Sequence, residues 1–318
     1  MDLAPVNRSA PSDGLSVIVP VFRSAPILPE LAARLCPVLQ SLGSRYELVL
    51  VDDGSPDDSW ATILGLAAQQ PWIRGVRMMR NYGQHNALLA GVRAARFATI
   101  MTMDDDLQHP PEEIPRLLAA FGPDVDVLYA TPQRPQHGVV RDLSSWVTKI
   151  ALRSAMGAET ARLVSAWRLF RTDLRVGFAE YQSPFVNLDV LLTWSGRRFG
   201  SLPVRHAPRR TGESNYTPGK LVRHALNMMT GFSVIPLQFA SVVGFLFTLF
   251  GVAVLVYVVV RYLLSGSTVA GFPFLASIIA IFSGAQLFAL GIIGEYLARI
   301  HFRTMNRPAY TIAETISS

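Results

Sequence analysis

The chain has 318 residues, a formal net charge of +6 and a hydrophobic content of 50%. A mean hydropathy of +0.29 is high for a water-soluble protein, so part of the chain is expected to lie in a membrane. The single cysteine, Cys36, excludes an intrachain disulfide and a multi-cysteine metal site, and it agrees with a reducing compartment.

The first half of the chain alternates short β-rich runs with longer helical patterns, which predicts an α/β fold. The expected strands are, in chain order, 15–22, 46–51, 73–79, 99–103, 125–130 and 199–206. The expected helices are 27–42, 58–68, 84–95 and 111–121, and a helical pattern returns over 136–157. Pro111 suits the first turn of its helix, where Glu112 and Glu113 lie near the positive end of the helix dipole.

Polar clusters follow three of these strands. They are residues 22–24, 52–55 and 104–106. Ligands of open α/β sheets bind at the carboxyl ends of the strands, so one cleft is expected to collect all three clusters.

Residues 104–106 are three consecutive aspartates, and burying such charge is costly without a cation. In an extended backbone Asp104 and Asp106 project to one side and Asp105 to the other. Mg²⁺ or Mn²⁺ held by one or two such carboxylates can also bind a diphosphate and neutralise it as it leaves. The alternative is a solvated acidic loop or a helix cap, because Asp-x-Asp is a short pattern.

The cluster 52–55 and a further polar stretch at 81–86 each have a functional and a purely structural interpretation. After the second strand, a carboxylate of Asp52 or Asp53 could accept hydrogen bonds from a nucleobase or a ribose, or the segment could be only a turn with a cap. After the third strand, the polar groups of 81–86 could reach a nucleotide or sugar, or they could only make the turn.

Two long stretches, 224–260 and 262–294, carry no charged side chain apart from a possible proton on His224. Each exceeds the roughly 20 residues that cross a bilayer, which predicts membrane helices at 236–262 and 272–297. Basic residues precede the first span and follow the second, so both termini are expected to face the cytoplasm. This clustering, without an aromatic and basic recognition module, favours anionic lipid and not nucleic acid as the partner of the basic residues.

Small residues recur at intervals of seven in both spans, which returns nearly to one helix face. They are Gly244 and Gly251 in the first span, and Ser277, Gly284, Gly291 and Ala298 in the second. These strips fit packing of the hairpin against itself or packing between subunits.

These motifs resemble the inverting family 2 glycosyltransferases that transfer sugars to polyprenyl phosphates, among them dolichyl-phosphate mannose synthases and bactoprenol glucosyltransferases. The likeness is strongest to undecaprenyl-phosphate 4-deoxy-4-formamido-L-arabinose transferases, and it spans nearly everything after residue 15. It rests on 81–85, 106–108, 110–117, 212–216, 284–286, 294–296 and 307–308.

The resemblance implies a GT-A (Rossmann-like) α/β domain followed by an interfacial helix and two C-terminal membrane helices. The expected organisation is a flexible N-terminus at 1–14, a cytosolic GT-A domain at 15–218, an amphipathic helix at 219–235, a membrane hairpin at 236–297 and a cytosolic tail at 298–318. The relatives further imply a bacterial inner-membrane location and a homotetramer.

The resemblance also implies roles for individual residues. Nucleotide binding falls to Pro20, Phe22, Asp52, Asp53, Asn81, Gln84, Asp104 and Asp105. A metal, Mg²⁺ or Mn²⁺, falls to Asp104, Asp106 and Gln108, and the catalytic set is Asp104, Asp106 and Arg168. The acceptor phosphate falls to Arg141, Arg209, Arg210, Ser214 and Tyr216.

Two positions depart from the family pattern. Arg23-Ser24 stands where relatives commonly have Asn-Glu, and Ala166 stands where many carry an acidic residue two positions before Arg168. The expected activity is transfer of a sugar from a nucleotide sugar, with UDP favoured, to a polyprenyl phosphate with inversion. The alternatives are transfer to another membrane glycolipid and a catalytically silent protein that binds a nucleotide sugar.

Overall fold

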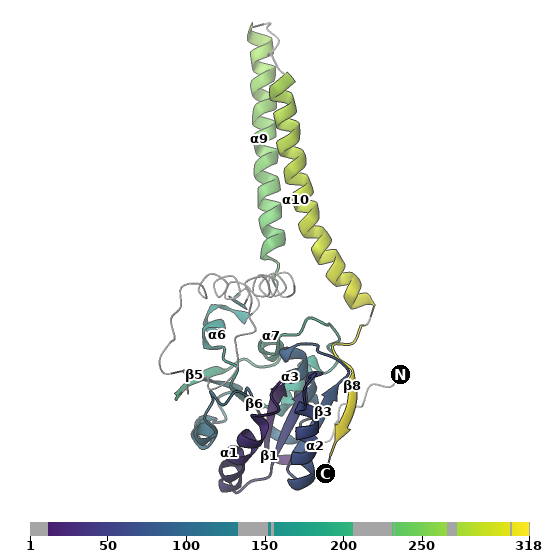
Figure 1. Cartoon of the computed structure of the whole chain (residues 1–318). Helices are drawn as coiled ribbons and strands as arrows, with labels where there is room; N and C mark the ends of the chain where they lie inside the picture. The colour runs from purple at the N-terminus through teal and green to yellow at the C-terminus, as the bar shows by residue number, and fades with distance from the viewer. Residues whose placement is uncertain are drawn as a thin grey trace.

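The structure, a computed structural model, describes residues 12–132, 152–153, 156–205, 231, 233–265, 272–305 and 307–317. Two long helices rise from one end of a domain built around an eight-stranded sheet (Figure 1). The strands are β1 Ser12–Val21, β2 Tyr46–Asp52, β3 Ile73–Met78, β4 Phe97–Thr102, β5 Val127–Pro132, β6 Arg168–Arg171, β7 Phe199–Val204 and β8 Ile312–Ile316.

The sheet has the order β7-β5-β6-β4-β1-β2-β3-β8. Its centre, β4-β1-β2-β3, is parallel, whereas β6 and β8 run antiparallel to their neighbours β4 and β3. The carboxyl ends of β1, β2, β3 and β4 therefore lie along one edge. This arrangement confirms the predicted α/β fold.

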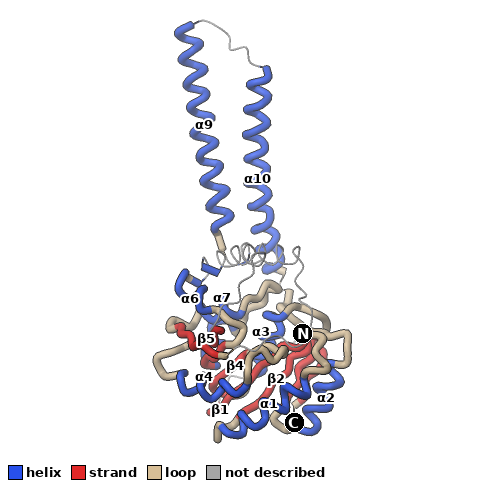
Figure 2. The backbone as a smooth tube through the Cα atoms, turned by 60° about the vertical axis from the view of Figure 1, so that its left-hand side comes forward, coloured by secondary structure: helices blue, strands red, loops and turns tan. Residues whose placement is uncertain are grey.

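Helices cover both faces of the sheet (Figure 2). They are α1 Leu28–Ser41, α2 Ser59–Gln69, α3 Gln84–Ala94, the 3₁₀ turn η1 Pro111–Glu113, α4 Ile114–Ala120, α6 Ala158–Leu163, the 3₁₀ turn η2 Thr172–Phe178 and α7 Leu188–Thr193. Alternate residues of a strand face opposite layers, so Val17 and Val19 pack with α1, α2 and α4, while Ile18 packs with α3 and α7. The predicted helix at 111–121 is divided, because its first turn is 3₁₀.

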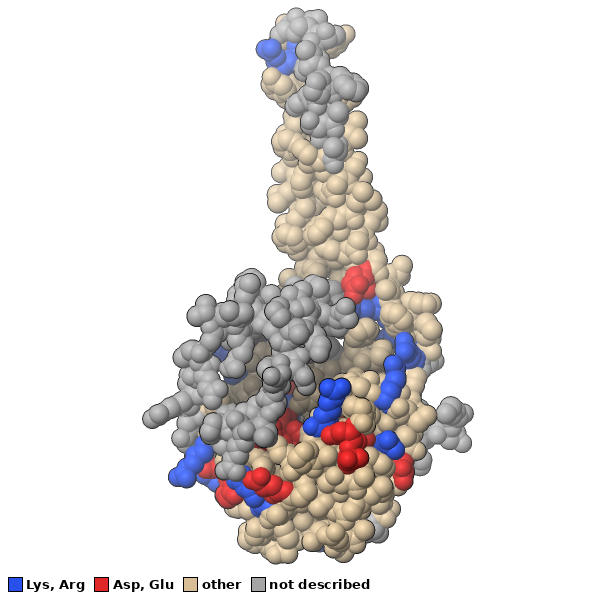
Figure 3. Space-filling model, viewed as in Figure 1, with Lys and Arg blue, Asp and Glu red and all other residues tan. Residues whose placement is uncertain are grey.

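The two long helices are α9 Ile235–Ser265 and α10 Phe272–Thr304. Within them, Ile235–Leu264 and Ile281–Thr304 are long and apolar enough to cross a membrane. Charged side chains gather on the globular part of the molecule and are sparse along this hairpin (Figure 3). Of the predicted strip, Gly251 faces the other helix, where a Cβ would lie 2.9 Å from the Phe282 ring.

The segment predicted as a C-terminal tail contains a strand of the sheet. Strand β8 pairs with β3 and forms the edge of the sheet, and Trp60 Nε1 donates to Glu314 Oε2 at 3.2 Å. Met79 N, just beyond β3, donates to Thr311 O at 2.9 Å. Because β8 follows α10 after a short connection, this pairing holds the carboxyl edge of the parallel strands toward the base of the hairpin (Figure 1).

Candidate active site

The turn after β2 lies directly against the loop after β3. Gly54 has a φ of 64°, and a Cβ there would lie 2.4 Å from the backbone carbon of Arg80. Only glycine tolerates both this conformation and this approach. The contact lets Asp53 accept hydrogen bonds from the backbone N–H groups of Tyr82 at 2.7 Å and Gly83 at 2.8 Å. The structure thus brings the predicted cluster 52–55 into contact with the polar stretch 81–86.

Asp53 and its neighbour Asp52 have different electrostatic surroundings. Burial raises the pKa of Asp53 to about 6, although the two backbone hydrogen bonds act in the opposite direction. Asp52 is also buried, and its Oδ1 accepts from Ser55 N at 3.0 Å. Its Oδ2 has no hydrogen-bond donor among the described residues, and Arg77 Nε lies 3.7 Å away. Asp52 therefore has one oxygen without a hydrogen-bond donor in the described part of the chain, beside the Arg77 charge, whereas both oxygens of Asp53 shape the loop.

The aspartate triplet lies in a bend and not in an extended strand. Strand β4 ends at Thr102, and the chain turns over Asp105, Asp106 and Leu107, with Leu107 at a φ of 58°. The buried Leu107 side chain anchors this turn in the core. The expected alternation of carboxylate directions applies to an extended backbone, and the chain is bent at this point.

Each aspartate of the triplet is hydrogen-bonded to a different segment. Gln84 Nε2 donates to Asp104 Oδ1 at 2.7 Å, and Ser24 Oγ donates to Asp105 Oδ2 at 2.5 Å. The backbone N–H of Gln108 donates to Asp106 Oδ1 at 3.1 Å. Burial raises the pKa of Asp105 to about 6, with the Ser24 hydrogen bond opposing this and the Asp106 charge adding to it.

Residues 22–24 complete the same edge. Arg23 N contacts Ser55 Oγ at 3.2 Å, and Ser24 N contacts Ser59 Oγ at 3.0 Å. The Phe22 ring is partly exposed, with the Arg23 guanidinium 5.3 Å from its centre, while Pro20 is buried in β1. All three polar clusters are therefore linked by hydrogen bonds. Ser24, a departure from the family pattern, provides the link to the triplet.

Asp104 and Asp106 offer carboxylate oxygens for a divalent metal ion. Among the described residues, no three or more His, Cys, Asp and Glu side chains form a group that could hold an ion. Asp104 and Asp106 are half-buried, and Asp106 Oδ2 has no donor in the described part of the chain. Mg²⁺ commonly takes one or two carboxylates and completes its shell with water and phosphate. The residues therefore fit an ion that arrives with a diphosphate.

Arg168 is enclosed and not open to the cleft. It is 3% exposed, and its Nε lies 3.3 Å from Asp189 Oδ1, which also accepts from the Tyr129 hydroxyl at 3.0 Å. Its Nη1 has no hydrogen-bond partner among the described residues. Register places Arg168 beside Thr102, at the end of β4. The sequence reasoning missed Asp189, although a carboxylate in the apolar run 188–192 signals a buried partner.

Other predicted residues have simpler positions. Asn81 and Gln84 are exposed on the loop that opens α3. The predicted acceptor residues Arg141, Arg209, Arg210, Ser214 and Tyr216, the helical pattern at 136–157 and most of the predicted interfacial helix lie outside the described residues. His85 Nδ1 accepts from Leu188 N at 3.2 Å.

Solved structures share this fold. Glucosyl-3-phosphoglycerate synthase from Mycobacterium tuberculosis, in complex with Mn²⁺ and UDP-glucose, matches with a TM-score of 0.50 and 17% identity, covering 72% of this chain and 82% of that one. The same enzyme with Mn²⁺, UDP and phosphoglyceric acid matches with a TM-score of 0.50 and 18% identity, covering 70% and 78% of the two chains. At such identities the likeness concerns the fold alone.

Similar sequences extend over the sheet and the hairpin together. An undecaprenyl-phosphate 4-deoxy-4-formamido-L-arabinose transferase of Shewanella sediminis is 33% identical over 308 residues, covering 96% of this chain and 93% of the relative. That of an Enterobacter species is 34% identical over 307 residues, covering 95% and 94%. The model of the family described as "Glycosyl transferase family 2" matches residues 16–174. The chain therefore belongs to glycosyl transferase family 2.

Proposed function

We propose that this protein transfers a sugar from a nucleotide sugar to a polyprenyl phosphate at the cytoplasmic face of a bacterial inner membrane. The observation that carries the proposal is the likeness to undecaprenyl-phosphate sugar transferases. This likeness covers both the hairpin and the carboxyl edge of the sheet with residues 104–106, which we call the aspartate edge. Orientation of the carboxyl edge toward the hairpin base supports it, because a lipid-borne acceptor needs a site beside the bilayer.

The donor side is assigned to Asp52, Phe22 and the aspartate triplet. Asp52 Oδ2, which lies 3.7 Å from Arg77 Nε and has no hydrogen-bond donor among the described residues, suits a ribose hydroxyl or a base N–H, since leaving a buried carboxylate oxygen without a donor is costly. The partly exposed Phe22 ring offers a surface on which a base stacks. Gln84 and Ser24 hold the Asp104 and Asp105 carboxylates in place before the donor binds.

The chemistry proposed is a single displacement with inversion. An oxygen of the acceptor phosphate attacks the anomeric carbon, and the bond from that carbon to the diphosphate breaks, with the nucleoside diphosphate taking the electron pair. A divalent ion, held by Asp104 and Asp106, would supply positive charge to that leaving group. A phosphate monoester with a second pKa of about 6 is largely anionic at neutral pH, so the Ala166 position needs no base.

The direct test is transfer by the purified full-length protein. A panel of isotope-labelled nucleotide sugars is offered with undecaprenyl phosphate, and the lipid product is identified by mass spectrometry. A polyprenyl-phosphate sugar is the expected product. Glycosylation of a different lipid without this product would replace the proposed acceptor, and binding of nucleotide sugars without any transfer would identify a silent protein.

The aspartate edge is tested in the same assay. Asp104→Asn and Asp106→Asn are each expected to lower turnover by roughly 10²-fold or more, because charge stabilisation at the leaving group is lost. Asp124→Asn is the control, since that side chain is 96% exposed at the start of the β5 segment. Unchanged turnover in both edge variants, with unchanged melting temperatures, would remove the metal role. The homotetramer and the positions of both termini stay predictions that need a structure in a bilayer mimic.

A further inference from the structure

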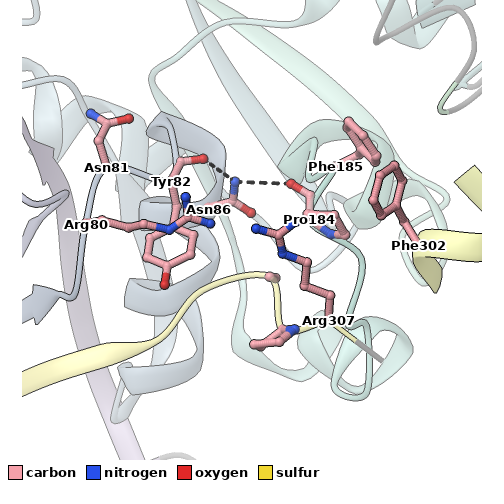
Figure 4. A pocket seen from close by; sticks show the side chains of 10 residues that line it. Arg80, Asn81, Tyr82, Asn86, Pro184, Phe185, Phe302 and Arg307 are labelled. Atoms are coloured by element: carbon pink, nitrogen blue, oxygen red, sulfur yellow. Dashed lines mark hydrogen bonds between the residues drawn. The ribbon is translucent and has the colours of Figure 1, made fainter. Parts of the chain in front are cut away.

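A cavity of about 280 Å³ lies at the base of the hairpin, and none of the three clustered aspartates 104–106 is among its lining residues. Its walls come from the loop before α3, the segment before α7, the last turn of α10 and the residues leading into β8. Figure 4 shows Arg80 and Tyr82 on one side, and Phe185 and Phe302 on the other. Arg307 points between them, while Asn81 points away. The cavity is thus formed where the hairpin joins the domain.

The lining of this cavity, which we call the juxtamembrane pocket, is basic. It contains Arg80 and Arg307 and no acidic residue. Both arginines are exposed, and within the described part of the chain neither has a carboxylate within 4 Å. The Arg80 guanidinium lies over the Tyr82 ring, 4.6 Å from its centre. Two planar cations without a protein counter-charge are suited to a phosphate ester, which they bind through paired hydrogen bonds.

A second, independent observation concerns Asn86. This side chain is 6% exposed, and its Nδ2 donates to the backbone oxygens of Tyr82 at 2.6 Å and Pro184 at 3.4 Å. Because both partners are acceptors, the atom that contacts them is the nitrogen of the amide, and the other amide atom is the oxygen Oδ1. This buried atom has no hydrogen-bond donor among the described residues, and Asn86 is one of the residues that line the pocket (Figure 4). A buried acceptor of this kind calls for a ligand hydroxyl or N–H.

The position of the pocket indicates where such a ligand comes from. Phe302 belongs to the last turn of α10, a helix whose segment Ile281–Thr304 could cross a membrane. Phe185, the neighbouring wall, carries the Arg299 guanidinium of α10 at 4.4 Å from its ring centre. The apolar side of the pocket therefore adjoins the membrane helix, Arg80 lies on the opposite side, and Arg307 points between the two. This polarity matches a lipid whose head group points away from the bilayer.

We propose that the juxtamembrane pocket binds the head group of an anionic glycerophospholipid, with Arg80 and Arg307 on the phosphodiester and Asn86 Oδ1 accepting from a head-group hydroxyl. The bound lipid would couple the foot of α10 to the loop that Asp53 holds. The proposal goes beyond sugar transfer and does not depend on it.

The test uses native mass spectrometry of the full-length protein in detergent, titrated with phosphatidylglycerol. Wild type is expected to retain one tightly bound lipid, and R80Q/R307Q is expected to bind it on the order of tenfold more weakly. The matched control is R45Q/R197Q. It removes the same charge from two exposed arginines that have no carboxylate within 4 Å in the described structure and lie away from the hairpin base. Equal binding by all three proteins would overturn the proposal.

Further ligands separate the parts of the proposal. Phosphatidylmethanol has the same charge but no head-group hydroxyl, so it is expected to bind several-fold more weakly than phosphatidylglycerol; equal binding would overturn the role of Asn86. Glycerol 3-phosphate is the soluble source of the same chemistry. If it binds wild type as tightly as the lipid does and R80Q/R307Q loses it, the lipid assignment falls. Melting temperatures of all variants show whether they fold.

Discussion

The α/β domain and the helical hairpin use the same apolar residue types in opposite ways. In the domain, Phe170 is fully buried between the sheet and its covering helices. On α9, Phe245 is 67% exposed, and Leu263 is 75% exposed. An apolar side chain gains free energy when it leaves water, whichever surroundings it enters. The domain supplies those surroundings itself, whereas the hairpin requires lipid or another chain.

The two regions also treat charge differently. The domain buries Asp52, Asp53 and the Arg168–Asp189 pair, each beside hydrogen-bonding groups at or next to the carboxyl edge of the sheet. The described part of the hairpin keeps its charges near the ends of its helices, as with Arg261 and the Glu295–Arg299 pair. Buried charge is costly, and the domain accepts that cost where a polar ligand is proposed to bind.

The largest expected effect comes from matched phenylalanine truncations in the two regions. Phe170→Ala should lower the free energy of unfolding of the domain by about 3–5 kcal/mol, because it leaves a cavity in the core. Phe245→Ala should leave that free energy unchanged, since the ring makes no part of the domain. Denaturant unfolding of the full-length protein in detergent measures both. Equal losses in the two variants would break the comparison.

The pH dependence of stability tests the buried charge of the domain. The pKa of Asp53 is raised from 3.8 to about 6, so its stabilising contribution is complete below pH 3.8 and is lost as the pH rises through 6. Relative to Asp53→Asn, wild type should therefore lose on the order of 2 kcal/mol of stability between pH 4 and pH 7. The measurement is the difference in unfolding free energy between the two proteins across this range.

Asp57 is a control, because its contribution to the free energy of unfolding changes with pH in the opposite direction. Burial acts to raise its pKa, but hydrogen bonds from Ser59 and Ala25 outweigh this and lower it. Its contribution is therefore present above pH 3.8 and lost as the pH falls. A difference between wild type and Asp53→Asn that does not change with pH would contradict the assigned burial of Asp53.

The smallest expected effect concerns packing inside the hairpin. Gly251→Ala places a methyl group 2.9 Å from Phe282, whereas Gly244→Ala meets nothing within 4 Å in this chain. Both changes raise helix propensity equally, so the difference between them isolates the contact. Gly251→Ala should be less stable than Gly244→Ala by about 1 kcal/mol, measured by circular-dichroism melting in detergent. The reverse order would indicate that Gly244 packs against another subunit.

Sequence pattern alone determined much of this protein. The spacing of apolar residues along the first half predicted its strands and helices to within a few residues. This works because each element buries one face, which sets the spacing of its apolar residues. The absence of charge over long stretches predicted both hairpin helices. The polar clusters at strand ends were also correctly brought to one edge, since parallel strands share the direction of their carboxyl ends.

Tertiary structure decided what depends on contacts between distant segments. Strand β8 pairs with β3 across positions such as Arg77 and Glu314, and Trp60 of α2 also bonds Glu314, 254 positions away; no local pattern encodes these contacts. The different tasks of Asp52 and Asp53 follow from the approach of the Arg80–Gly83 loop over Gly54. Likewise, Asp189 meets Arg168 only because α7 packs behind β6. A side chain's hydrogen-bond partners are determined by the packed chain around it, whereas its tendency to be buried is already present in its own chemistry.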